Sequence, residues 1–217
     1  MTNRPLCFDY NRALEEQLSQ LLRRMSDHFE RYPFRVTVLL IGSLSRGEAS
    51  WFMLDDEPQL VSDIEFLLFL DSPEEHRATI ARSFAYFASA LKLSEDHPTL
   101  HLDYTLIAYS QIPKLERKLI VFESKEYGRV LCGPEVRHLL PDIALANVNM
   151  MDLKDILNHR LYSMIYYGRL ADHGSATTNA YVLAKNGLDL LTLYLASNFS
   201  ILEAGYARRL QCLLTLD

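Results

Sequence analysis

The feature that most constrains the fold is the segment SDIEFLLFL, residues 62–70, in which two acids stand at the start of an apolar run. An apolar run of this length is typical of a strand. Side chains alternate across a strand, so Asp63 and Glu65 share one face while Ile64 and Phe66 share the other. Burying two carboxylates is costly unless a cation meets them. The strand therefore either exposes its acidic face to solvent or holds a cation against it.

A second strand pattern carries a third acid. In TLHLDYTLIAY, residues 99–109, Asp103 lies between Leu102 and Tyr104, and His101 shares its face. If the two strands are neighbours, three carboxylates converge, and their mutual repulsion favours a divalent cation. Oxygen ligands suit Mg²⁺ or Mn²⁺ and not zinc. The alternative is that the acids occupy the solvated face of an antiparallel sheet and that His101 is a packed strand residue.

A glycine-serine pair follows the most apolar strand pattern in the first half of the chain. The run VTVLLI, residues 36–41, leads into GSLSRGEASW, residues 42–51. At a strand-to-helix corner, Gly42 and Ser43 can offer backbone N–H groups and a hydroxyl to phosphate oxygens. Taken alone, the pair is also explained by an ordinary turn. Together with the three acids, it favours a phosphate-binding turn.

The remaining pattern divides the chain into two parts. Up to about residue 140, helical periodicity alternates with the strands, and Asp9 or Asn11 can cap the first helix. The helical segments of this part are 14–29, 72–93 and 113–127, and a short extended segment covers 128–133. After residue 140 the pattern is helical throughout, with helices expected over 152–171, 176–197 and 201–216.

Composition excludes several classes of protein. Apolar residues make up 49% and charged residues 23% of the 217 residues, the balance of an ordinary soluble globular protein. No segment has the length and apolarity of a transmembrane span, and the N-terminal stretch lacks a secretion-signal pattern. The three cysteines are far apart and odd in number, which indicates reduced thiols. We therefore expect a cytoplasmic protein with no membrane partner.

The charge balance bears on nucleic-acid binding. The net charge of −6 argues against sequence-independent binding to DNA or RNA, which depends on clustered Lys and Arg. We expect no sequence-specific nucleic-acid partner either. A single nucleotide remains compatible, because the field of a pocket can differ in sign from that of the whole surface.

These motifs resemble those of a known family. The pattern IGSLSRGEAS followed by SDIEFLLF resembles the signature of nucleotidyltransferases with the DNA polymerase β-like fold, especially the minimal and antibiotic-modifying branches. The segment ESKEYGRVLCG, residues 123–133, is similar to the one that closes the catalytic domain in bacterial members. The resemblance covers roughly residues 34–133. It implies an α+β fold class: a small mixed β-sheet flanked by helices in a catalytic domain, 1–140, followed by an all-helical C-terminal domain, 141–217.

The resemblance also implies a site. Gly42 and Ser43 would hold the triphosphate of an NTP, with ATP as the expected nucleotide. Asp63 and Glu65 would be the metal-binding pair, and Asp103 would be the third catalytic and metal-binding acid, nearest the acceptor. Two Mg²⁺ ions, or Mn²⁺ in their place, would assist an in-line displacement at such a site.

Two basic residues are candidates for phosphate contacts, each with an alternative. Arg46 either touches phosphate or forms a structural salt bridge within the turn. Lys185, on the helix expected over 176–197, either pairs with the triphosphate or is a surface lysine.

The chain departs from the compact spacing of the family between Ser43 and Asp63. The excess lies in WFMLDDEPQL, residues 51–60. We interpret it as a surface insertion, because lengthening a surface loop costs little free energy. Alternatively, Trp51 could stack on a base or on the acceptor.

The sequence therefore predicts a Mg²⁺-dependent nucleotidyltransferase that moves a nucleoside monophosphate from an NTP to a hydroxyl acceptor, with release of pyrophosphate. The acceptor would be a small molecule, a sugar or a protein. The alternative is a non-catalytic member of the same fold that binds a nucleotide, or binds a partner through its helical tail. The last expected helix, 201–216, is apolar and lacks a C-cap glycine. This indicates either a longer native protein or a last helix that docks on the core or on a partner. A homodimer is a candidate assembly.

Overall fold

The computed structural model describes residues 6–7, 9–54, 57–90, 101–169 and 176–216. The chain divides into two compact units. One consists of Met1–Leu115 with Glu123–Pro141, and the other of Glu116–Phe122 with Asp142–Asp217. The division after Pro141 lies beside the expected domain boundary, but the segment Glu116–Phe122 belongs with the second unit.

The first unit contains a mixed four-stranded sheet. Its strands in spatial order are β5 (Leu102–Ala108), β4 (Ile64–Leu70), β1 (Val36–Ile41) and β6 (Arg129–Cys132). β4 and β5 are parallel, whereas β1 is antiparallel to both of its neighbours, β4 and β6. All residues of β1 are buried, which explains why its sequence shows no apolar–polar alternation. The unit therefore has the expected α+β class with a small mixed sheet.

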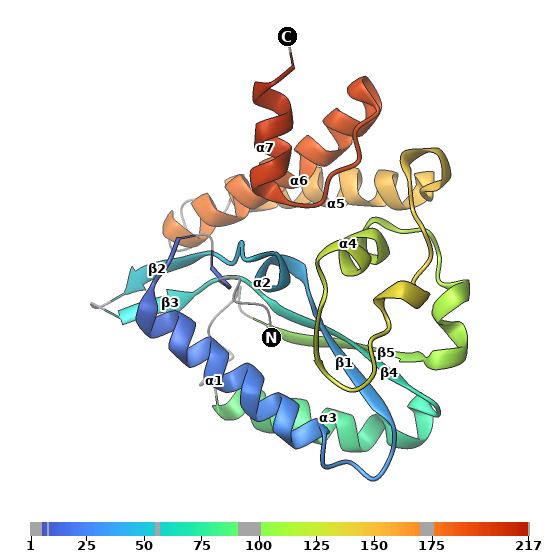
Figure 1. The fold of residues 1–217 in the computed structure, drawn as a ribbon. Coiled ribbons are helices and arrows are strands. Elements are labelled where there is room, and N and C mark those ends of the chain that lie inside the picture. The colour runs from blue at the N-terminus through green and yellow to red at the C-terminus, as the bar shows by residue number, and fades with distance from the viewer. Residues whose placement is uncertain (1–5, 8, 55–56, 91–100, 170–175, 217) are drawn as a thin grey trace. The chain divides into compact units, whose positions relative to one another are not determined.

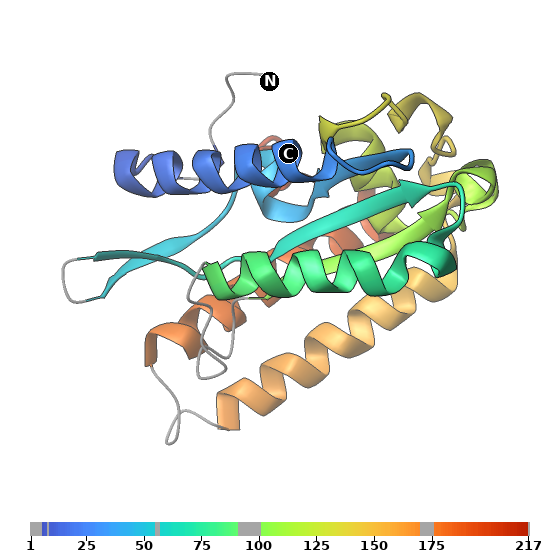
Figure 2. The same cartoon turned by 90° about the horizontal axis from the view of Figure 1, so that it is seen from below.

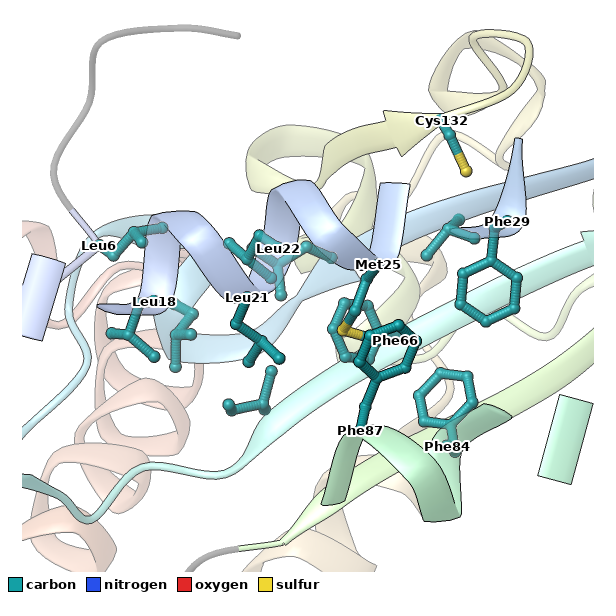
Figure 3. Close-up of a cluster of buried hydrophobic side chains, with 14 of the residues drawn as sticks. Leu6, Leu18, Leu21, Leu22, Met25, Phe29, Phe66, Phe84, Phe87 and Cys132 are labelled. Atoms are coloured by element: carbon teal, nitrogen blue, oxygen red, sulfur yellow. The ribbon is translucent and has the colours of Figure 1, made fainter. Parts of the chain in front are cut away.

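Helices α1 (Arg12–Phe29) and α3 (Pro73–Ala90) lie along one face of this sheet (Figures 1 and 2). Asn11 caps α1, because its side chain accepts a hydrogen bond from the backbone N–H of Leu14 at 3.1 Å. Figure 3 shows part of the core between the helices and the sheet, which includes Met25, Phe29, Phe66, Phe84 and Phe87. Each large apolar side chain buried there contributes about 1.5–3 kcal/mol. The even-numbered residues of β4 therefore form the face of the strand that packs against this core.

The segment 51–60 forms a β-hairpin. Its strands are β2 (Trp51–Leu54) and β3 (Glu57–Leu60), and the turn residues Asp55 and Asp56 lie outside the described residues. The Trp51 ring packs against the core, and its indole N–H donates to the carbonyl of Asp9 at 2.8 Å. The insertion is thus a two-stranded hairpin whose tryptophan is hydrogen-bonded to the N-terminal segment. Base stacking by Trp51 stays a prediction.

The helix expected over 113–127 is shorter than predicted. A 3₁₀ segment, η1 (Tyr109–Lys114), contains Pro113, and helix α4 begins only later, as Leu119–Tyr127. Leu115, with φ −57° and ψ 139°, leaves the helical region and ends η1, so the apolar pattern does not continue as one helix. The N–H of Leu119, at the start of α4, donates to the Asp152 carboxylate at 2.7 Å.

The second unit is helical, as expected. The 3₁₀ segment η2 (Arg137–Leu139) still belongs to the first unit. The second contains the 3₁₀ segment η3 (Leu145–Asn147) and then α5 (Met150–Arg169), α6 (Ala176–Phe199) and α7 (Tyr206–Leu214). The last helix is shorter than the predicted 201–216, because its N-cap, Gly205, has an extended backbone with φ −77° and ψ 133°. Within the described ranges, no helix combines the length and apolarity needed to cross a bilayer.

Candidate functional site

Glu65 and Asp103 occupy neighbouring positions on adjacent strands. Glu65 on β4 is the register partner of Asp103 on β5 and of Ile41 at the end of β1. Paired strands lie about 4.8 Å apart, so the two acidic side chains leave the sheet side by side on one face. The next residue, Phe66, is buried in the core on the opposite face. Asp103 is exposed and Glu65 half-buried, so both remain accessible.

On β4 the accessible part of this face is limited to the beginning of the strand, whereas on β5 it extends past Asp103 to the exposed Thr105. Further along β4 on the same face, Leu67 and Phe69 are buried, and the Phe69 ring lies 6.4 Å from that of Tyr109. The apolar cover therefore ends where the acids begin. Like charges on neighbouring strands destabilise a sheet by roughly 0.2–1 kcal/mol, so the arrangement has a cost.

Asp63 lies one residue before β4 and reaches toward the beginning of β5. Its Oδ1 accepts a hydrogen bond from the backbone N–H of His101 at 3.1 Å. The N–H of Ile64 in turn donates to the carbonyl of His101 at 2.9 Å. The contact between the two strands thus extends past their ends and brings Asp63 beside the strand that carries Asp103. His101 itself is exposed.

Gly42 lies directly against the Glu65 carboxylate. Gly42 begins the short helix α2 (Gly42–Arg46) with a φ of +70°, in the left-handed region. A Cβ at this position would overlap Oε2 of Glu65. Backbone conformation and space both favour glycine here. The structure therefore places the Gly-Ser turn and the second acid in contact, and Ser43 follows as a half-buried residue of α2.

Hydrogen bonds to its backbone carbonyls hold α2 in place. The Ser45 hydroxyl donates to the carbonyl of Gly42 at 2.8 Å, and the N–H of Glu48 donates to the carbonyl of Ser43 at 2.9 Å. From β6, Nε of Arg129 donates to the carbonyl of Ser45 at 2.7 Å. The backbone carbonyls of Gly42, Ser43 and Ser45 thus all accept hydrogen bonds.

Arg46 forms a structural salt bridge, which is one of the two roles that the sequence suggests for it. Its Nε donates to Glu48 at 2.8 Å and its Nη1 to Glu123 at 2.9 Å, and the Arg46 side chain is only 4% exposed. Glu123 lies on α4, and nothing in the sequence links it to a residue 77 positions earlier. The arrangement joins α2 to α4, and a phosphate contact by Arg46 stays a prediction.

Lys185 lies on α6 in the second unit, half-buried. The first unit contains all the other candidate residues: Gly42, Ser43, Arg46, Asp63, Glu65 and Asp103. The triphosphate contact expected of Lys185 stays a prediction.

The donor set suits a hard divalent cation. Three carboxylates offer oxygen ligands, which Mg²⁺ and Mn²⁺ prefer. In the described part of the chain, no three acidic, histidine or cysteine side chains are grouped closely enough to hold a metal ion. Asp63 is hydrogen-bonded to His101, and Glu65 lies against Gly42. To share a cation with Asp103, these two side chains would have to turn away from their present contacts.

Comparison with known proteins adds no family to these observations. No known family model matches the chain, and no curated protein is significantly similar to it. The functional interpretation depends on the site geometry and on the motif resemblance.

Proposed function

We propose that this protein is a divalent-cation-dependent nucleotidyltransferase, with a polymerase β-like core in its first unit. The observation that carries the proposal is the position of Glu65, which lies between the backbone of Gly42 and the neighbouring acid Asp103. A turn suited to phosphate and a carboxylate pair suited to a cation are therefore adjacent. The order strand, Gly-Ser turn, short helix and antiparallel acidic strand also follows the motif that the sequence resembles.

Each residue has a role in this proposal. Backbone N–H groups at Gly42 and Ser43 bind phosphate oxygens of an NTP, ATP being the expected one. Asp63 and Glu65 hold Mg²⁺, two ions being expected, with Mn²⁺ as a substitute. When bound, such cations neutralise phosphate charge and favour in-line displacement.

Asp103 orients the acceptor and takes its proton. It is the exposed acid on β5, the edge strand of the sheet, so an acceptor hydroxyl can approach it from solvent. The hydroxyl oxygen forms a bond to the α-phosphorus while the bond from that phosphorus to the bridging oxygen breaks. Pyrophosphate leaves with that oxygen, and the hydroxyl proton passes to Asp103.

Transfer of label from an NTP carrying ³²P at the α-phosphate tests the proposal. We expect label to appear on a hydroxyl acceptor only when Mg²⁺ or Mn²⁺ is present. The acceptor panel should include sugars, amino sugars, nucleotides and the protein itself. Asp63→Ala should abolish the transfer, because one of the cation-holding carboxylates is lost.

Asp71→Asn is the matched control. Asp71 is an exposed acid just beyond the other end of β4, so its loss should leave transfer unchanged. Suppose instead that wild type transfers no label from any NTP to any acceptor, and that wild type and Asp63→Ala bind nucleotide with equal affinity. The non-catalytic alternative would then replace this proposal.

A further inference from the structure

Helix α5 packs one face on α6 and exposes large apolar side chains on the opposite face. One face packs on α6 in the second unit, where Asn186 donates to Ser163 at 2.8 Å and Arg160 pairs with Asp189 at 2.9 Å (Figure 1). The other, which we name the outer face of α5, consists of side chains that are 38–69% exposed: Met151, Leu157, Leu161, Tyr162, Ile165 and Tyr166. A surface helix normally carries one apolar stripe, and a helix that is apolar all round is normally covered.

The outer face is large enough to form an interface. Aromatic side chains offer about 150–250 Å² of surface and aliphatic ones less, so at 38–69% exposure these six expose on the order of 600 Å². A standard interface buries about 800 Å² on each partner. The rings of Tyr162 and Tyr166 are already stacked, with centroids 6.2 Å apart, and tyrosine is enriched at protein interfaces. The outer face thus supplies most of the area that one partner needs.

Charge on the outer face favours a protein partner. Two exposed charged residues of opposite sign, Lys154 and Asp155, lie within the outer face, since they stand seven positions before Leu161 and Tyr162 respectively. Helices that lie on membranes carry many Lys and Arg residues beside their apolar face, and nucleic acids also require clustered positive charge. Neither pattern is present on the described face.

Asn158 favours a second copy of the chain as the partner. It is exposed, and it lies three and four positions before Leu161 and Tyr162, which places it in the middle of the outer face. A carboxamide has both donors and an acceptor, so two asparagines can pair with each other. A single asparagine within an apolar helix interface sets the pairing of identical helices in this way. In a twofold dimer, the centre of the patch meets its own copy.

We propose that the outer face of α5 binds the same face of a second copy, forming a symmetric homodimer with Asn158 at its axis. The proposal is independent of the chemistry at the acidic site.

The molecular mass in solution tests it. By light scattering after size exclusion, wild type should have twice the 25.0 kDa mass of one chain. Leu161→Asp places a charge in the interface and should weaken association about 100-fold or more, as loss of a central contact does. Leu214→Asp makes the same change at an 84% exposed leucine on α7 and should leave the dimer intact.

A cross-link tests the position of the axis. In a Cys212→Ser background, Asn158→Cys should give a disulfide-linked dimer under mild oxidation, whereas Ala184→Cys, at an exposed position on α6, should not. If Leu161→Asp fails to fold by circular dichroism, the milder Ile165→Asn replaces it. A monomeric wild type would overturn the proposal. So would an outer-face variant that dimerises like wild type, or equal cross-linking at both cysteine positions.

Discussion

Gly42 meets two constraints at once. Its φ of +70° lies in the region that other residues rarely adopt, and the space where a Cβ would stand contains the Glu65 carboxylate. The sequence alone indicates a glycine at a strand-to-helix corner. It does not indicate contact with Glu65, because that contact depends on the antiparallel register of β1 and β4, which pairs Ile41 with Glu65.

Gly42→Ala should destabilise the protein by about 1–2 kcal/mol, the cost of left-handed backbone in a residue with a Cβ. It should also displace the Glu65 carboxylate and reduce label transfer. The measurement is the chemical denaturation midpoint. Gly187→Ala is the matched control: Gly187 lies within α6 with nothing near its Cβ position, so alanine should stabilise by about 0.5–1 kcal/mol. A Gly42→Ala midpoint at or above that of wild type would contradict this interpretation.

Among the elements, α2 depends most on residues distant in sequence. Arg46 joins it to α4 through Glu123, and Arg129 joins it to β6. β1, β4, β5 and α1 were predicted from the sequence, because apolar periodicity is a local property. The start of α4 was not, since the carboxylate of Asp152 that receives the N–H of Leu119 lies 33 residues later. Long-range partners of this kind leave no local pattern.

Arg46→Met should cost about 3–5 kcal/mol, because it removes the guanidinium that pairs with two buried or nearly buried carboxylates, Glu48 and Glu123. Denaturation monitored by circular dichroism gives the value. Arg77→Met removes a salt bridge to Glu74 in which both side chains are more than half exposed, and it should cost less than about 1 kcal/mol. Equal losses in the two variants would show that the Arg46 cluster does not stabilise α2.

The two compact units differ in their thiols. Burial raises the pKa of the Cys7 thiol to about 12 and that of Cys132 to about 11, and both residues are in the first unit. Cys212, in the second unit, is partly exposed. The sequence predicts reduced thiols but not their order of reactivity, because burial follows from tertiary packing. It also cannot assign Glu116–Phe122 to the second unit, since that grouping arises from contacts with residues after 141.

A thiol reagent at pH 8 should therefore modify Cys212 first, and all three cysteines only after unfolding. Thiolate is the reacting form, and the raised pKa values make it scarce at Cys7 and Cys132. These groups favour folding below the unfolded thiol pKa of 9.0, and their contribution falls as pH rises from there toward about 12. Rapid modification of Cys7 or Cys132 in the native protein would contradict this burial.

The most direct test of the acidic site is nucleotide-dependent binding of Mn²⁺, measured by electron paramagnetic resonance of the free ion. We expect wild type to bind Mn²⁺ tightly when an NTP is present. Glu65→Gln should weaken that binding at least about tenfold, since loss of one ligand costs 1.4 kcal/mol or more. Asp71→Asn, at the other end of β4, should not change it. Unaltered Mn²⁺ binding in a variant combining Asp63→Asn, Glu65→Gln and Asp103→Asn would contradict the proposed site.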